Sequence, residues 1–462
     1  MSTIDYPEQQ VWKPKNRTYL GTKTAEPDRL EYTGGRGELF WLALSRMLMT
    51  ILTLGIGRFW MTTRLRRFYW SSISIGGEPL EYTGRAGEKL IGFLIAVVIL
   101  AVYLVFTSLL LTFAGFAVYD GDPIALSFLQ LSILPLFPLG FWAQYRARRY
   151  ILARTRWRGI RFGLAPGAWG YMWRALGWGF LTLVTAGLLY PLMQLKLSRY
   201  LTDRSHYGSL RFTQEGRLRP LMISWMWVWM PVAVVAAVGL FGAFQYFDFS
   251  TIGDLEALGD GDGKRLNERD ESTDPNPFSL AAGAIGGGAM IVALFAWVTF
   301  ALIHHRIFSF RYLNSNKVLE GGTRFDFRIG MGSIIGIYIV GSIVIWLLVG
   351  IIAGLLIGLS FGIMAALGID PRVLREFGSG ELTGLSELLS VIPVIVGYLP
   401  GIAAYIALRH AFFTHPLLKE VAATVTVNDL SAANEAAQRA HDEQAEAGGF
   451  ADALGADIGG AF

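Results

Sequence analysis

Two arginines interrupt apolar stretches of this sequence and are its first candidates for chemistry. Arg46 lies five residues after Trp41, and Arg174 lies five residues after Trp169. An ionisable side chain within an apolar segment is costly and by default indicates a functional site. Alternatively, each guanidinium extends to the membrane surface, where water solvates it. Four threonines lie near breaks in the same stretches and would either bond backbone carbonyls or line a polar path: Thr50, Thr53, Thr182 and Thr185.

Other kinds of reactive site are poorly represented. The chain has no cysteine, which excludes disulfides, thiolate zinc sites and a cysteine nucleophile. Its six histidines form no H-E-x-x-H pattern, and there is no P-loop. Gly358-Leu-Ser360-Phe-Gly362 fits the G-x-S-x-G pattern of serine hydrolases, but it lies in an apolar helical stretch, where the required strand-to-helix turn is missing. We therefore expect no catalytic residue, no metal, no cofactor and no enzymatic activity.

A second set of arginines recurs beside aromatic residues. Trp60 and Trp142 each precede three arginines and then another aromatic residue, and Arg409 begins a degenerate copy. Such clusters anchor helix ends at the cytoplasmic interface, or they bind the head groups of anionic lipids, and the two roles are compatible. Basic residues interleaved with membrane aromatics do not favour nucleic-acid binding. The candidate head-group contacts are Arg64, Arg66, Arg67, Arg146, Arg148, Arg149, Arg199 and Arg311.

Glycine repeats at every fourth position of one long apolar stretch. A row of glycines on one face of a membrane helix lets a neighbouring helix approach to backbone contact. We expect this row to pack against another helix of the same chain, and the alternatives are association with a second copy of the chain or a helix that moves or lines a pore. The four positions are Gly350, Gly354, Gly358 and Gly362.

The composition indicates a membrane protein. Hydrophobic residues make up 53% of the 462 residues and charged residues 16%, whereas soluble domains contain about 25% charged residues. Apolar stretches longer than the roughly 20 residues that cross a bilayer core occur repeatedly. The full spans are expected at about 90–118, 124–145, 221–247, 280–305, 332–366 and 388–412.

The distribution of charge predicts the topology. Basic segments occur at 58–89, 146–161, 196–219 and 306–328. Short basic loops remain in the cytoplasm, so all four should lie on one side, with both termini cytoplasmic. A single crossing by Glu38–Trp60 would put the basic segment 58–89 and the acidic turn Asp120–Asp122 on the wrong sides for their charges. A single crossing by Ala168–Leu195 would place the basic segments 146–161 and 196–219 on opposite sides. We therefore predict that each is a re-entrant helical hairpin, broken near Gly55 or Gly187. The alternative is two ordinary spans, which gives eight in all.

An internal repeat organises the chain. Apolar helices, arginine clusters and short glycine-turned strands recur in the same order, and strands are expected at 30–34, 80–84, 161–163, 210–212, 324–327 and 421–427. The predicted fold class is an all-α polytopic membrane protein with six full transmembrane helices, two re-entrant helical hairpins and short cytoplasmic β-hairpin elements. The predicted units are a mobile tail (1–28), unit 1 (29–162), unit 2 (163–328), unit 3 (329–427) and a cytoplasmic Ala/Glu-rich tail (428–462).

The segment from Leu52 to Gly84 resembles the signature of the YjgN-like family of bacterial inner-membrane proteins, a domain of unknown function. Gly57, Phe68 and Leu80 depart mildly from it. The resemblance implies location in a bacterial cytoplasmic membrane, and it carries no activity. The matching positions are Leu52, Thr53, Leu54, Gly55, Ile56, Phe59, Trp60, Arg64, Arg66, Arg67, Trp70, Ile75, Gly77, Tyr82 and Gly84.

Two functions from different classes are consistent with these features. The paired hairpins, the intramembrane arginines and the glycine row favour a channel or secondary transporter for a small solute. That is the function we expect first. The alternative, which the arginine–aromatic clusters and the missing catalytic set favour, is a non-catalytic membrane scaffold or an anionic-lipid-binding protein. The expected partners are the phospholipid bilayer, anionic lipids and, if the glycine row is intermolecular, a second copy of the chain.

Overall fold

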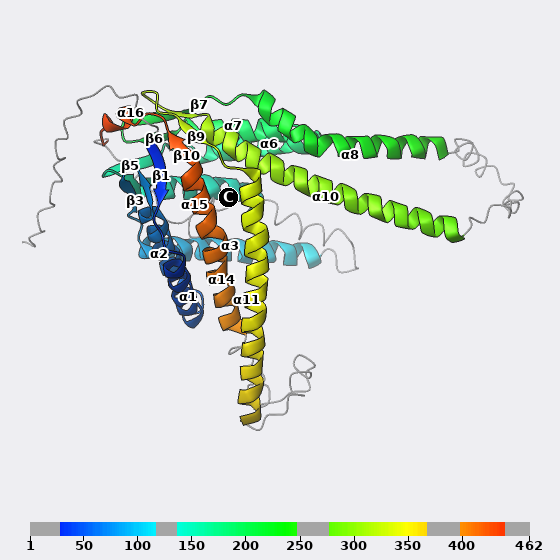
Figure 1. The fold of residues 1–462 in the computed structure, drawn as a ribbon, viewed down its shortest axis with the longest axis horizontal. Coiled ribbons are helices and arrows are strands. Elements are labelled where there is room, and N and C mark those ends of the chain that lie inside the picture. The colour runs from blue at the N-terminus through cyan, green and yellow to red at the C-terminus, as the bar shows by residue number, and fades with distance from the viewer. Residues whose placement is uncertain (1–27, 117–135, 247–276, 367–397, 439–462) are drawn as a thin grey trace, which may run out of the picture.

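The structure is a computed structural model, and it describes residues 28–116, 136–246, 277–366 and 398–438 of the chain. Long helices extend from a small β-sheet, with α8 and α10 running together in one direction and α11 and α14 in another (Figure 1). The helices are α1 (Arg36–Leu52), α2 (Arg58–Ser71), α3 (Ala86–Phe116), α5 (Leu136–Ala153), α6 (Ala168–Val184), α7 (Tyr190–Thr202), α8 (Leu218–Tyr246), α10 (Pro277–Ser315), α11 (Met331–Ala366), α14 (Leu399–Arg409), the π-helix η4 (His410–Thr414), α15 (His415–Thr424) and α16 (Ser431–Asn434).

The sheet lies where the strands were expected. Strands form at all six places singled out in the sequence, which confirms short β elements in a mostly helical protein. The strands are β1 (Asp28–Tyr32), β2 (Ile73–Ile75), β3 (Glu78–Tyr82), β4 (Thr155–Trp157), β5 (Ile160–Leu164), β6 (Ser205–Tyr207), β7 (Leu210–Gln214), β8 (Lys317–Leu319), β9 (Phe325–Phe327) and β10 (Val425–Val427).

These strands join into a closed ring, which the sequence did not predict. Within the described residues the antiparallel sheet has ten strands, in the order β8-β7-β6-β5-β4-β3-β2-β1-β10-β9. The outer strands β8 and β9 are consecutive in the chain, and a bridge between Val318 and Arg324 connects them. β1 pairs with β10, Asp28 opposite Val427, so opposite ends of the described chain meet. We call this sheet the sheet ring.

Glycines allow the tight turns of the sheet ring. Gly76 and Gly77 connect β2 to β3 with φ of 57° and 81°, and Arg158 and Gly159 connect β4 to β5 with φ of 50° and 78°. Positive φ at both central residues is the type I′ geometry, whose twist matches that of the flanking strands. The turns therefore lie at the end of each hairpin that is opposite its helices.

Every helix pair leaves the sheet ring and returns to it at paired strands. The five pairs within the described residues are α1–α2, α3–α5, α6–α7, α8–α10 and α11–α15, and we call the place where each returns a junction. A backbone hydrogen bond just beyond the strands closes every junction: Thr33 to Ser72 (2.9 Å), Thr83 to Arg154 (2.8 Å), Ala165 to Arg204 (3.0 Å), Glu215 to Asn316 (2.9 Å) and Arg328 to Thr424 (3.1 Å).

Four of the described helices are long and apolar enough to cross a membrane: Ala86–Leu109, Leu218–Phe241, Gly288–Ser315 and Met331–Ala366. They correspond to four of the six expected spans. The expected spans at 124–145 and 388–412 both run into residues outside those described. Large apolar side chains on the four helices are exposed, among them Leu240 at 72%, Phe295 at 74% and Trp346 at 77%. Such continuous apolar surface fits contact with lipid.

The two stretches expected to turn back in the bilayer form helical hairpins. α1 and α2 pack against each other, as do α6 and α7, and each hairpin begins and ends at paired strands of the sheet ring. The chain breaks at 53–57 and 185–189, as the glycines indicated. How deeply either hairpin enters a bilayer stays a prediction, as do the total number of spans, the sidedness of the termini and the unit boundaries.

The sheet ring has an apolar interior. Ile75, Trp157, Tyr207 and Leu319, the last residues of β2, β4, β6 and β8, gather in a single cluster with Ala433 of α16. Residues from strands so widely separated in the sheet order can meet only inside a closed ring. The described part of the C-terminal tail thus packs on the sheet ring through Ala433.

Candidate functional site

A basic residue occupies the same place at every junction. It stands six residues before the first strand of each hairpin and is Arg67, Arg149, Arg199, Arg311 or Lys419. Two of these side chains make the same bond: Arg67 Nη2 donates to Gly84 O (3.0 Å) and Arg199 Nη2 to Gly216 O (3.1 Å). They tie the returning helix to the start of the next one. The fifth member is Lys419, whereas the sequence pattern suggested Arg409.

Several of the expected head-group arginines are occupied by protein contacts. Arg66 is 6% exposed and donates to the Tyr82 hydroxyl (3.3 Å). Lys89, 1% exposed, also approaches Tyr82, with its Nζ 5.5 Å from the centre of the ring. Arg146 lies 4.9 Å from the ring centre of Trp142. These cation–π contacts favour a structural role. Arg64 is exposed on α2.

The fourth junction differs because its arginine borders a cleft. A cavity of about 490 Å³ lies between the end of α10 and the end of β9. Arg311 is exposed and, within the described residues, has no hydrogen-bond or ion-pair partner. We call this cavity the junction cleft. The residues that line it are Phe308, Arg311, Tyr312, Ser315, Asp326, Phe327 and Arg328.

The walls of the junction cleft are ordered by aromatic stacking and one ion pair. Phe308 and Tyr312 stack with ring centres 5.9 Å apart and planes 4° apart. Arg328 Nε donates to Asp326 Oδ2 at 2.7 Å, so its charge is partly balanced, while that of Arg311 is not. The cleft therefore has a net positive charge beside an apolar wall, which suits an anionic ligand with an apolar body.

A further cation lies inside the sheet ring. Lys317 is two residues before Leu319 and so shares its interior face. Its Nζ donates to Asn314 Oδ1 at 2.7 Å. Burial, reinforced by the charge of Arg148, lowers the pKa of Lys317 to about 7, and burial also lowers the pKa of Arg148. Two positive charges from different junctions thus act on each other.

The threonines of the hairpins bond backbone groups. Thr50 Oγ1 donates to Arg46 O and Thr182 Oγ1 to Trp178 O, both at 2.8 Å. Thr53 Oγ1 donates to Met49 O (2.8 Å) and accepts from Gly57 N–H (2.7 Å). Thr185 Oγ1 donates to Leu181 O (2.9 Å) and accepts from Leu189 N–H (3.4 Å). In this conformation they satisfy the interrupted helices, one of the two roles expected for them.

Arg46 and Arg174 lie on separate hairpins and do not form a common site. Arg174 Nη1 donates to Gly170 O (3.0 Å), and its guanidinium lies 4.6 Å from the centre of the Tyr200 ring. Within the part of the chain that the structure describes, Arg46 Nη1 reaches only Met49 Sδ (3.9 Å). The turn of the α6–α7 hairpin is instead hydrogen-bonded by two tryptophans of α8, Trp225 and Trp229. The sequence analysis did not select either of them.

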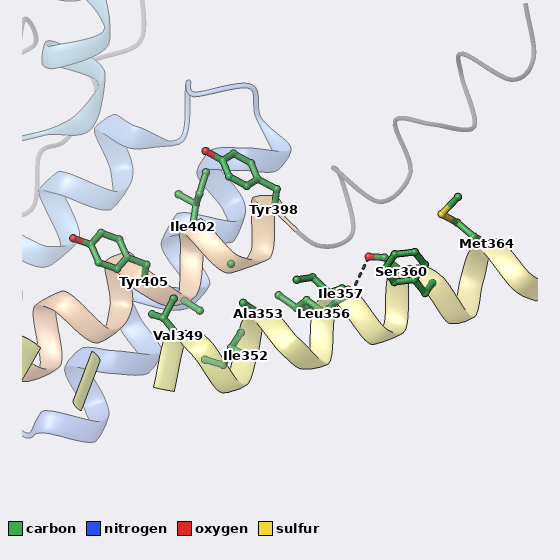
Figure 2. Close-up of a pocket in the computed structure, with 13 residues that line it drawn as sticks. Val349, Ile352, Ala353, Leu356, Ile357, Ser360, Met364, Tyr398, Ile402 and Tyr405 are labelled. Carbon is green, nitrogen blue, oxygen red and sulfur yellow. Dashed lines mark hydrogen bonds between the residues drawn. The ribbon is translucent and has the colours of Figure 1, made fainter. Parts of the chain in front are cut away.

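The glycine row of α11 is not a contact surface within the described residues. A Cβ added at Gly350, Gly354, Gly358 or Gly362 would meet no atom within 4 Å. Close approach occurs at Gly341, where a Cβ would lie 2.9 Å from Phe412 O. The neighbouring face of α11 forms an apolar groove of about 560 Å³ with α14 (Figure 2). Ser360 lines it and donates to Leu356 O (2.8 Å), as in an ordinary helix.

The described residues contain no group of three or more His, Asp or Glu side chains placed to hold a metal ion. Basic residues recur at the junctions and inside the sheet ring, and some of them pair with acidic residues, as Arg154 does with Glu88 (3.0 Å). Their arrangement can bind anions.

Comparison with known proteins places the chain in a family. Residues 27–370 match the family described as "Bacterial protein of unknown function (DUF898)". The chain belongs to the DUF898 family. A relative from Salmonella typhimurium (strain LT2), named "Inner membrane protein YjgN", is 26% identical over 159 residues. That match covers 33% of this chain and 36% of the relative, so only about a third of that protein is compared. No solved structure matches the chain.

Membership in the DUF898 family agrees with the helices and with the sequence resemblance noted above. The protein is a membrane protein of unknown function, and its relative is named for the inner membrane. The family description names no activity, so any function has to be argued from the geometry of this chain.

Proposed function

We propose that this DUF898 protein is a non-catalytic membrane scaffold that binds the head groups of anionic lipids at its junctions. The junction cleft carries the proposal, because it combines an exposed arginine, Arg311, with a stacked aromatic wall and a volume of about 490 Å³. A lipid phosphate would pair with the guanidinium of Arg311 while the glycerol and the first methylenes would pack on Phe308 and Tyr312.

The position of the cleft supports this ligand. Arg311 lies in the last turns of the candidate span Gly288–Ser315, and Arg328 lies three residues before the candidate span that begins at Met331. Residues at the ends of membrane helices are at head-group depth. Each basic residue near an anionic leaflet contributes about 1 kcal/mol of attraction, and aromatic side chains are favoured at the same depth.

The test compares lipid retention by charge-matched variants. The double variant Arg311→Gln/Arg328→Gln should lose most of the phosphatidylglycerol that co-purifies in mild detergent, as measured by mass spectrometry. The double variant Arg211→Gln/Arg324→Gln is the control, because it removes the same charge from two exposed residues that do not line the cleft. Equal retention by the two variants would refute the site.

Two further measurements sharpen the result. Asp326→Asn removes the only acidic residue that lines the cleft among those described and should increase lipid retention. Glycerol phosphate and inorganic phosphate should fail to stabilise the purified protein against heat at concentrations where phosphatidylglycerol vesicles do so. Stabilisation by the soluble phosphates alone would identify the ligand as a free phosphate compound.

A channel or secondary transporter for a small solute is the second candidate, and the closed sheet ring favours it. The ten described strands form a closed ring, and Lys317, which shares the face of Leu319, is under the influence of Arg148. Helices of 17 and 14 residues, as in α1 and α2, are about 26 and 21 Å long at 1.5 Å per residue. They fall short of a bilayer core of about 30 Å, which supports re-entrant hairpins beside the full spans.

Flux measurements test this candidate. Proteoliposomes should pass a small anion such as chloride, and Lys317→Gln should lower the rate. Because the lowered pKa of Lys317 is about 7, its positive charge is largely present at pH 6 and largely lost at pH 8. Flux should therefore fall as the pH rises through 7, and this dependence should vanish in Lys317→Gln. If none of the small ions tested passed through the proteoliposomes, the channel or transporter candidate would be eliminated.

A further inference from the structure

The segment from Leu430 to Gln438 lies across the mouth of the sheet ring, at the end where the hairpins turn. Arg158, in the β4–β5 turn, donates to Asn434 Oδ1. Arg161 N–H donates to Gln438 Oε1 (2.9 Å), and Ala437 N–H donates to Ser209 Oγ (3.2 Å). α16 lies beside the strands in Figure 1. The segment thus bonds two separate hairpins, and we call it the stopper.

The turn glycines are shaped to the stopper. A Cβ at Gly208 would lie 2.5 Å from Ala437 O, one at Gly76 would lie 3.1 Å from Leu430 Cδ1, and one at Gly321 would collide with Ala432 Cβ. Their positive φ values of 53°, 57° and 94° suit glycine on their own, but the close approach is a separate requirement. Together with Arg158, the stopper contacts four hairpins of the sheet ring.

The stopper covers apolar side chains. Trp157 and Leu319 are each 3% exposed, Tyr207 is 1% exposed, and Ala433 of the stopper, itself 3% exposed, joins their cluster. Without the stopper this cluster would face solvent at the mouth of the ring. An apolar patch at the end of a ring is the kind of surface that invites another chain or a solute.

The attachment of the stopper is weak compared with that of the strands. Its helix α16 has four residues, and its hydrogen bonds to Arg158, Arg161 and Ser209 lie at exposed positions. Segments with few buried contacts and exposed hydrogen bonds open at a much lower free energy than the whole fold. The strand β10, by contrast, is buried and paired on both sides.

We propose that the mouth of the sheet ring is a docking surface whose occupant is the chain's own stopper, and that the stopper leaves and returns while the ring stays folded. Seated, it blocks access to the interior of the ring. Released, it exposes Trp157, Tyr207 and Leu319 to a partner or a solute. The proposal does not depend on lipid binding or on transport.

The absence of cysteine makes thiol labelling a direct test. Leu319→Cys places a thiol beneath the stopper, and Leu164→Cys, at a residue that is 0% exposed in β5 and belongs to a different cluster, is the control. In the full chain a water-soluble maleimide should label position 319 at least about tenfold faster than position 164, a ratio that corresponds to about 1.4 kcal/mol in the free energy of opening. Equal rates would overturn the proposal, because only global unfolding would then expose either thiol.

Two adjacent glycines supply a matched pair of variants. Gly321 and Gly322 have φ of 94° and 96°, but only a Cβ at Gly321 meets the stopper. Gly321→Ala should accelerate labelling of Leu319→Cys beyond any effect of Gly322→Ala, which carries the same backbone strain. If both glycine variants change the rate equally, strain in the turn explains the effect and the stopper does not.

A disulfide lock tests the occupant. Ser209→Cys/Ala437→Cys joins positions that are already hydrogen-bonded, so oxidation should cross-link the chain within itself and slow the labelling of Leu319→Cys to the rate at position 164. Cross-linked dimers on a non-reducing gel would show instead that the stopper comes from a second copy, and would overturn the proposal in this form.

Discussion

The turn of the α1–α2 hairpin and the turn of the α6–α7 hairpin have the same backbone and different neighbours. Leu54 and Gly55 have φ of 50° and 94°, and Ala186 and Gly187 have φ of 49° and 87°. In both, the glycine N–H bonds a threonine carbonyl five residues earlier, at 2.8 Å in the first and 2.7 Å in the second. Local sequence is therefore sufficient to define the turn.

The two turns differ in the residues that surround them. Trp225 Nε1 donates to Gly187 O (3.0 Å), and Trp229 Nε1 donates to Ala186 O (3.1 Å), so α8 accounts for the free carbonyls of the second turn. Leu54 is 94% exposed, and a Cβ at Gly55 would meet no atom within 4 Å among the described residues. Among the described residues, the same turn thus exists with and without a docking helix, so docking is an added property of the second hairpin.

The largest expected effect comes from removing the docking tryptophan. Trp225 is 9% exposed, and its ring centre lies 4.8 Å from those of Tyr190 and His305. Trp225→Ala should destabilise the protein by about 3–5 kcal/mol, because a large buried aromatic is lost together with its hydrogen bond. Thermal unfolding in detergent measures this. Trp41→Ala, at a residue that is 67% exposed on the first hairpin, should change stability by far less, and an equal loss would contradict the comparison.

Threonine variants should destabilise the first hairpin more than the second, the opposite of the order expected for the tryptophan variants. Thr53 accepts from Gly57 N–H at 2.7 Å, whereas Thr185 accepts from Leu189 N–H at 3.4 Å. Thr53→Val should cost about 1–2 kcal/mol, since it leaves a backbone donor without its partner. Thr185→Val should cost less than half of that. Chemical denaturation in mixed micelles compares them, and a larger cost at position 185 would show that α8 docking raises the demands on its turn.

The two arginines should differ modestly. Arg174 bonds a carbonyl and lies over Tyr200, whereas Arg46 has a methionine sulfur as its polar contact among the described residues. Arg174→Met should lower stability by about 0.5–1 kcal/mol, the value of an exposed cation–π contact, and Arg46→Met should leave it almost unchanged. If Arg46→Met alone abolished flux or lipid retention without changing stability, Arg46 would be functional in spite of its sparse contacts.

The smallest effect is expected at the strained residue of each turn. Leu54 and Ala186 adopt the left-handed conformation that side chains resist. Leu54→Gly and Ala186→Gly should each stabilise the protein by about 0.5 kcal/mol, after the entropy cost of glycine is included. Hydrogen exchange at the two turns reports the change. Destabilisation by Leu54→Gly would indicate that the exposed leucine has a lipid contact that matters.

Much of the local structure could be read from the sequence. The six strand positions, the two helix breaks and four spans follow from alternation, glycine placement and apolar length, which act over short stretches. Closure of the sheet ring could not be read in this way, because it requires β1 to pair with β10, nearly 400 residues later in the chain. The fifth junction was assigned to Arg409, although the π-helix His410–Thr414 and α15 lie between that residue and β10. Lys419 therefore takes its place.

The candidate sites likewise depend on contacts between distant segments that the sequence does not reveal. Arg311 was recognised from its repeat, but Asp326 and Arg328 enter the junction cleft only because β9 returns beside α10. The stopper has an Ala-rich polar sequence, which predicts a helix in solvent. Its seat depends on the shape of the turns around Gly208 and Gly321, and no pattern within residues 428–438 reveals that.

The pairing of β1 with β10 joins the first and last described strands of the sheet ring. The first strand remains with an open edge until the last strand has left the ribosome, since no other described strand takes that place. An unpaired edge is prone to join foreign strands, so the interval between synthesis of the two strands is the period of greatest risk. A chain shortened before Val425 would keep this edge, and that of β9, open for its whole lifetime.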